Sequence, residues 1–103
     1  MTKSELQSLL NRINFLSVYS PESINDYCSI LKLCIDKLQA LQQEDKSPMF
    51  DAWLSMGIQE IRKELNERFN NGFNDLSDDR KKTEFLYSRS VVTMALTNIL
   101  MHF

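Results

Sequence analysis

Two cysteines and one histidine are the side chains of this chain that could act as a nucleophile, a general base or a soft metal ligand near neutral pH. A nucleophilic thiol would need Cys28 or Cys34 beside His102, with a third group to orient the imidazole. The sequence assigns no such third group, and a single histidine cannot build a histidine-based zinc site within one chain. We therefore predict no catalytic residues.

The spacing of the cysteines bears on their chemistry. On one helix, Cys28 and Cys34 differ by ~240° of rotation and lie ~9 Å apart along the axis. That separation exceeds the span of a disulfide. We interpret both as small buried side chains in a reducing compartment, with an intermolecular disulfide or a reactive thiol as the alternative.

Oxygen ligands for a metal ion occur at two places. Acidic and basic residues are interleaved on one stretch, at Glu60, Arg62, Lys63, Glu64, Glu67 and Arg68. The i,i+4 pairs Glu64–Arg68 and Lys63–Glu67 favour a solvated, salt-bridged helix face over a carboxylate metal cluster. The segment 70–79 lacks the Asp-x-Asp-x-Asp-Gly order and final glutamate of a calcium loop, and helix caps account for its residues. We predict no metal and no cofactor.

Arg80, Lys81 and Lys82 form a basic cluster that could contact nucleic acid. The net charge of −2 and a pI near 5.3 differ from the high pI of a typical nucleic-acid-binding domain. A helix-turn-helix also needs short helices and a polar recognition helix, whereas the helices here read as long. Nucleic acid is disfavoured as a partner, and a DNA-binding regulator is the third hypothesis for function.

Four amphipathic stretches must position all of these residues. Thr2 and Glu5 have the form of a capping box before the first stretch. Ser20-Pro21 and Ser47-Pro48 open the second and third, because serine caps a helix and proline fits its first position. Asp75 or Ser77 caps the fourth. Apolar residues recur at spacings of three and four along each stretch.

Glycine and asparagine mark two special points. Gly57 lies inside the third stripe, where it costs ~1 kcal/mol relative to alanine. A close approach of a neighbouring helix and simple tolerance are both open explanations. Asn71 or Gly72 is suited to the left-handed residue that ends the third helix.

The pattern predicts an all-α, single-domain fold over residues 1–103. We expect a mostly antiparallel four-helix bundle with helices near 3–17, 21–43, 48–70 and 78–102. The scarcity of glycine and proline, two of each, disfavours a sheet with tight hairpins. The N-terminus has no apolar signal-peptide core, and no stretch reaches ~18 apolar residues, so we expect a soluble, cytoplasmic protein with no membrane partner.

The last helix departs from the pattern, because it is apolar on most sides from Val91 onward. Either it lies in the centre of the bundle, or it leaves an apolar face for a partner or a second copy. We expect the last turn, Met101-His102-Phe103, to dock onto another surface.

No catalytic set can be assembled, so we predict a non-enzymatic module that binds another protein. We expect it to be a stoichiometric inhibitor or immunity-type protein that blocks its target by covering it. Small helical bundles also occur among toxin inhibitors and secretion chaperones, a likeness of architecture that assigns no site. The alternative is a homodimeric structural or chaperone-type protein that pairs through the C-terminal helix. The candidate anchors of a partner are Tyr19, Phe73, Tyr87, Met101 and Phe103. The candidate rim charges are Glu44, Asp45, Asp75, Asp78 and Asp79.

Overall fold

The computed structural model describes residues 1–45, 47–70 and 72–103, and these fold into a helical bundle without a β-strand in the described ranges. Its elements are α1 (Lys3–Phe15), α2 (Pro21–Glu44), α3 (Pro48–Lys63), the π-helical turn η1 (Glu64–Arg68), the 3-10 turn η2 (Phe73–Asp75) and α4 (Asp78–Met101). The predicted all-α, four-helix architecture is thereby confirmed.

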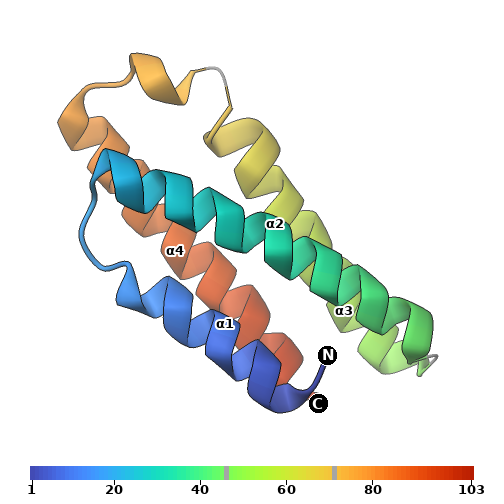
Figure 1. Cartoon of the computed structure of the whole chain (residues 1–103). Coiled ribbons are helices and arrows are strands. Elements are labelled where there is room, and N and C mark those ends of the chain that lie inside the picture. The colour runs from blue at the N-terminus through green and yellow to red at the C-terminus, as the bar shows by residue number, and fades with distance from the viewer. Residues whose placement is uncertain (46, 71) are drawn as a thin grey trace.

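The four helices run alternately up and down the bundle (Figure 1). α1 and α3 each pack against both α2 and α4, so the helices form a closed ring of neighbours around one core. The bundle measures 44 × 23 × 17 Å, and both chain ends lie at the same end of it (Figure 1). α1 is only 13 residues long, whereas α2 and α4 have 24 each.

The helices begin where the sequence indicates. Thr2 Oγ1 accepts the Glu5 N–H at 3.1 Å, and Ser20 Oγ accepts the Ser23 N–H at 3.0 Å. At the start of α4 the cap is Ser77, whose Oγ accepts a backbone N–H at 3.3 Å. Ser47 makes no such bond, so α3 begins with proline at its first position and without a side-chain cap.

The predicted end of the first helix near residue 17 is wrong by two residues. α1 stops at Phe15, and Leu16 leaves the helical conformation with a ψ of 70°. The Leu16 carbonyl oxygen instead accepts a hydrogen bond from Arg89 Nη1 of α4 at 3.0 Å. A hydrogen bond from α4 therefore provides the partner for the carbonyl oxygen of Leu16, at the end of α1.

The predicted end of the third helix also needs correction. Its α-helical part stops at Lys63 and continues as the wider turn η1, in which the Phe69 N–H reaches the Glu64 carbonyl oxygen at 3.1 Å. Gly72 has a φ of −79°, so it is not the left-handed cap that we expected. Asn71, the other candidate, lies outside the described residues.

Among the described residues, one buried side-chain hydrogen bond joins two helices across the apolar core. The hydroxyls of Tyr27 on α2 and Ser88 on α4 lie 2.8 Å apart, and both residues are fully buried. The Tyr27 ring makes edge contacts with Phe85 and Phe69, at centroid distances of 5.3 and 5.6 Å. Burial raises the pKa of the Tyr27 hydroxyl above its ordinary value, although the bond to Ser88 opposes the shift.

α3 and α4 approach closely at Gly57. A β-carbon on Gly57 would lie 2.6 Å from Ile99 Cδ1, closer than two carbon atoms can pack. Of the two explanations offered by the sequence, close approach of a neighbouring helix is therefore the one that the packing supports. This contact brings the two helices together along the side of the bundle described next.

Candidate functional site

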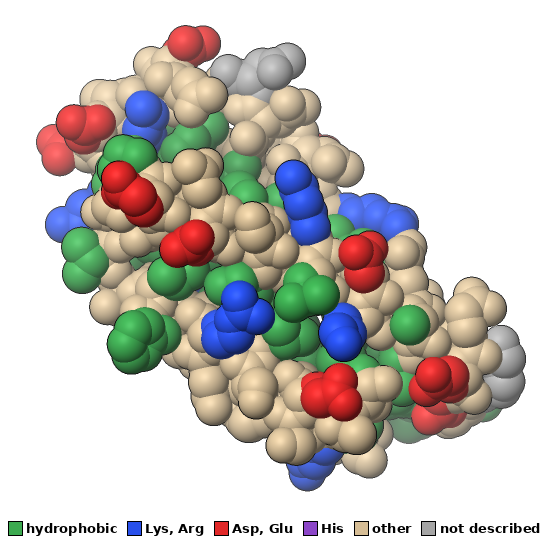
Figure 2. All heavy atoms as spheres, in the orientation of Figure 1, with side chains coloured by type: hydrophobic (Ala, Val, Ile, Leu, Met, Phe, Trp, Pro, Cys, Tyr) green, Lys and Arg blue, Asp and Glu red, His purple; other side chains and the backbone are tan. Residues whose placement is uncertain are grey.

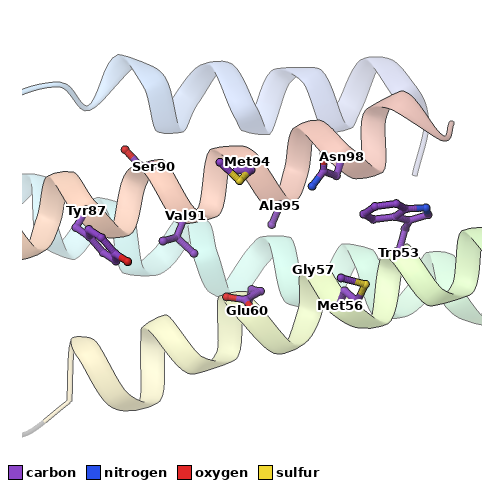
Figure 3. A pocket seen from close by; sticks show the side chains of 10 residues that line it. All are labelled: Trp53, Met56, Gly57, Glu60, Tyr87, Ser90, Val91, Met94, Ala95 and Asn98. Carbon is purple, nitrogen blue, oxygen red and sulfur yellow. The ribbon is translucent and has the colours of Figure 1, made fainter.

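The outer side of α3 and α4 is hollowed into a groove of about 470 Å³. Figure 3 shows α3 and α4 facing each other along it, with side chains from both directed toward the space between them. The lining residues are Trp53, Met56, Gly57 and Glu60 from α3, and Tyr87, Ser90, Val91, Met94, Ala95 and Asn98 from α4. We call this feature the α3–α4 groove.

The shape of the groove follows from the size of its residues. Gly57 has no side chain and Ala95 has a short one, so neither projects into the groove, although α3 and α4 approach closely at Gly57 (Figure 3). Larger side chains stand at its borders, where Met56 is 57%, Tyr87 60% and Met94 67% exposed. The groove is therefore an open trough with apolar walls, and not an enclosed cavity.

The last residues of the chain lie beside one end of the α3–α4 groove, at the lining residue Trp53. The His102 ring stacks on Trp53, with centroids 4.4 Å apart and an interplanar angle of 26°. His102 Nδ1 donates to the Asn98 carbonyl oxygen at 2.7 Å. The Phe103 ring makes an edge contact with the Phe50 ring, with centroids 5.3 Å apart. His102 and Phe103 of the last turn thus dock onto α3 of their own chain, whereas Met101 is 76% exposed.

A charged cluster lies beyond the other end, around Arg68 of η1. Arg68 Nε donates to Glu64 Oε1 at 2.7 Å, and its Nη1 donates to Glu84 of α4. The guanidinium carbon is 4.7 Å from the centre of the Tyr87 ring, a cation–π contact. Partial burial lowers the pKa of Arg68, but the bonds and charges of Glu64 and Glu84 outweigh this effect and raise it.

This cluster corrects the interpretation of the interleaved charges as a solvated face. The Glu64–Arg68 pair forms as predicted, but Glu64 is only 4% exposed. The predicted Lys63–Glu67 pair is not among the ion pairs of the described residues. The turn η1 places Glu64 and Arg68 where they join the end of the third helix to α4, a contact that a regular helical wheel does not predict.

The five candidate anchors fall into two groups. Three of them pack against other aromatic rings of the chain, namely Phe73, Tyr19 and Phe103, and two are largely exposed, namely Tyr87 and Met101. Phe73 is 5% exposed and packs edge-on against Phe69, with centroids 5.0 Å apart. Tyr19 lies half-buried against Phe85, and Phe103 occupies the contact with Phe50 described above. Of the five, Tyr87 alone lines the α3–α4 groove, while Met101 is 76% exposed outside it.

The candidate rim charges lie away from the α3–α4 groove. Glu44 and Asp45 are at the end of α2, whereas Asp75, Asp78 and Asp79 are near the start of α4, at the opposite end of the bundle (Figure 1). Neither group lines the groove. The basic cluster 80–82 occupies the first turn of α4 directly after these acidic residues.

Sequence reasoning missed most of the groove, although a second stripe could have revealed it. Tyr87, Val91, Met94 and Asn98 recur at spacings of four, three and four, and so share a helix face separate from the buried one. Trp53, Gly57 and Glu60 repeat in the same way on α3. The last helix is thus both core and surface: Val92, Leu96 and Ile99 are buried, while this second face is open.

The other surfaces carry a different mixture of residues. On the face seen in Figure 2, acidic and basic side chains are interspersed with apolar ones. Phe15, the last residue of α1, and Val18, which follows it, are 87% and 74% exposed, but the hollow beside Phe15 is bordered by both Arg12 and Asp26. The α3–α4 groove is the more uniformly apolar of these surfaces.

The thiols and the imidazole are in different settings. Cys34 is buried, as predicted, and burial raises its pKa to about 12. Cys28 is half-buried, and burial raises its pKa as well, so both thiols are protonated near neutral pH. His102 is engaged with Trp53 and Asn98, as described above. Among the described residues, no group of three or more His, Cys, Asp or Glu side chains is arranged to hold a metal ion.

Neither a membrane-spanning helix among the described residues nor a similar known protein is found. Within the described residues, none of the helices is both long enough and apolar enough to cross a membrane. Comparison of the chain with protein-family models, with curated proteins and with solved structures finds no match.

Proposed function

We propose that this protein is a non-enzymatic binding module whose α3–α4 groove holds an amphipathic helix of another protein. The observation that carries the proposal is the exposed apolar trough itself. Met56, Tyr87 and Met94 are each more than half exposed on one continuous surface. Contiguous exposed apolar side chains of this kind usually mark an interaction site.

The dimensions favour a helix as the occupant. From Tyr87 to Asn98 the groove follows α4 for ~16 Å, or three helical turns. A partner helix presents apolar side chains at i, i+3 or i+4, and i+7 over the same length. The volume of about 470 Å³ also lies within the range of small-ligand pockets, but such pockets enclose their ligand, whereas this groove is open along its side.

The side chains of the groove are suited to such a partner. Methionine has an unbranched, polarizable side chain that adapts to irregular surfaces, and two methionines stand on opposite walls here. Trp53 and Tyr87 lie toward the two ends (Figure 3), and residues of these types commonly dominate the energy of an interface. This arrangement supports binding by a few apolar anchors.

A module of this kind acts by occupancy. A partner helix in the α3–α4 groove would have its apolar face covered, and could not at the same time contact another protein through that face. We therefore propose a stoichiometric inhibitor: one copy of the protein sequesters one helix, and inhibition is lost when the groove is altered.

Display of a helical peptide library tests the proposal. Helices selected on the wild-type protein should lose at least about tenfold in affinity for Met56→Asp and Met94→Asp, because a carboxylate would be placed among apolar contacts. Met49→Asp on α3 and Met101→Asp on α4 are matched controls, since Met49 and Met101 are 70% and 76% exposed but do not line the groove. These controls should bind within twofold of wild type.

Two results would overturn the proposal. Selected helices could be insensitive to both groove variants, which would place binding elsewhere. Alternatively, light scattering could show a wild-type dimer that Met94→Asp converts to a monomer. A second copy of the chain would then occupy the α3–α4 groove, as in the homodimer hypothesis.

A further inference from the structure

Among the residues that the structure describes, Glu60 is the one acidic residue that lines the α3–α4 groove, and no basic residue lines it. It lies between Trp53 and Tyr87 along the groove, on the α3 wall below Val91 (Figure 3). Its side chain is exposed and takes part in none of the ion pairs or side-chain hydrogen bonds of the described residues. An unpaired carboxylate is thus set in the middle of an apolar surface.

Arg68, the cation that contacts the Tyr87 wall of the groove, cannot readily neutralise Glu60. Arg68 is bound by Glu64 and Glu84 and rests on the Tyr87 ring. Releasing it would leave Glu64 buried without a partner, which is costly. Lys63 follows Glu60 by three positions on α3, but it does not line the groove and forms none of the ion pairs of the described residues. A cation that meets Glu60 from within the groove therefore comes from the occupant.

When a partner helix covers the groove, Glu60 has a greater need for a cation to pair with. A partner helix removes water from around Glu60, and a carboxylate that loses water without gaining a partner opposes binding. A lysine or arginine at the facing position restores a partner, and its aliphatic stem can pack along the apolar wall. Charge complementarity thus selects among the apolar helices that would otherwise fit.

We propose that the occupant is an amphipathic helix with a lysine or arginine in the middle of its apolar face, paired with Glu60. This inference rests on the proposed function and narrows it to a class of partner. The basic residue is flanked on the same face by large apolar side chains, three or four positions before it and after it. One of these contacts the wall near Tyr87, and the other contacts the wall near Trp53.

The same requirement disfavours a second copy paired through the last helix. The segment from Ser90 to Phe103 contains no lysine or arginine. A symmetric pair made through this part of α4 would cover Glu60 of each copy without supplying a lysine or arginine from the segment. A different protein is therefore the better fit to the charge in the groove.

The test compares displayed helical libraries, randomised on one face, that are selected on wild type and on Glu60→Gln. Selection on wild type should enrich lysine or arginine at one central position between apolar residues, and selection on Glu60→Gln should not. Glu60→Lys should reverse the preference to aspartate or glutamate. Glu22→Gln, which changes an exposed glutamate at the start of α2, should leave the wild-type preference unchanged.

Affinities of one enriched peptide complete the test. Glu60→Gln should weaken its binding by about three- to fivefold, the effect of a partly exposed ion pair, and raising the salt concentration should reduce the difference. If the selected helices are apolar, bind in a Met94→Asp-sensitive way and show no basic preference, the inference about charge is wrong while the groove remains the binding site. If no selected helix is sensitive to Met94→Asp, the proposed function itself fails.

Discussion

Gly57 allows α3 and α4 to approach closely, because Ile99 Cδ1 of α4 lies only 2.6 Å from the position that a β-carbon on residue 57 would take. Ile99 is fully buried, so its side chain has little freedom to move aside. The same close approach forms the floor of the region in which the α3–α4 groove lies. Packing in the core and the shape of the proposed site therefore depend on one contact.

A double-mutant cycle tests this contact. Gly57→Ala should lower the free energy of unfolding by about 1 kcal/mol, because the overlap outweighs the gain in helix propensity. In an Ile99→Val background, which lacks the Cδ1 atom, the same change should instead stabilise the protein by up to about 1 kcal/mol. Urea denaturation measures both effects. An equal effect of Gly57→Ala in the two backgrounds would contradict the assigned contact.

The buried pair of Tyr27 and Ser88 gives a second prediction. Tyr27→Phe and Ser88→Ala should each reduce the free energy of unfolding by about 1–2 kcal/mol, because each leaves a buried hydroxyl without its partner. The double variant should lose less than the sum of the two. Thermal unfolding followed by circular dichroism suits this cycle, and strict additivity would show that the hydroxyls do not interact.

Alkaline pH should destabilise the fold, because the thiol of Cys34 and the hydroxyl of Tyr27 are buried in their neutral forms. Burial raises the pKa of Cys34 from 9.0 to about 12 and also raises that of Tyr27. A group whose folded pKa is raised contributes stability that is fully present below its unfolded pKa. Its contribution is lost as pH rises toward the folded pKa, because the unfolded chain then releases the proton more readily.

The expected result is a free energy of unfolding that falls from about pH 9 upward. Cys34→Val removes the thiol and should make the decline between pH 9 and 10 shallower, while Tyr27→Phe should act above about pH 10. Denaturation at a series of pH values measures the slopes. Identical slopes for wild type and Cys34→Val would show that the thiol does not titrate differently in the folded and unfolded chains.

Arg68 should be important for the stability of the fold, because it neutralises the charge of the buried Glu64 carboxylate. Arg68→Met should lower the free energy of unfolding by about 2–4 kcal/mol, since it leaves the buried Glu64 carboxylate unpaired. Adding Glu64→Gln should recover part of this loss, because a neutral amide costs less to bury than a charge. No recovery in the double variant would indicate that Arg68 acts through packing alone.

Local signals in the sequence explain much of the fold. The serine and proline residues at 20–21 and 47–48 mark the helix starts correctly, and Thr2 caps the first helix as its spacing indicates. These features depend on neighbours in the chain, so they are visible without a structure. The apolar stripes are visible for the same reason.

The errors arise where distant residues decide the local conformation. α1 stops early where Arg89 binds the Leu16 carbonyl oxygen, and the third helix widens where Arg68 reaches Glu84. Neither contact is encoded in a short window. The groove is an intermediate case: its stripe on α4 can be read from the sequence, but that α3 forms the opposite wall is known only once the helices are packed.

Methyl NMR of the five methionines tests the central claim most directly. With labelled methionine methyl groups and a selected helix that carries a central lysine, the signals of Met56 and Met94 should shift on binding, while those of Met49 and Met101 stay in place. The reverse pattern, with Met49 or Met101 shifting and Met56 and Met94 unchanged, would contradict binding in the α3–α4 groove.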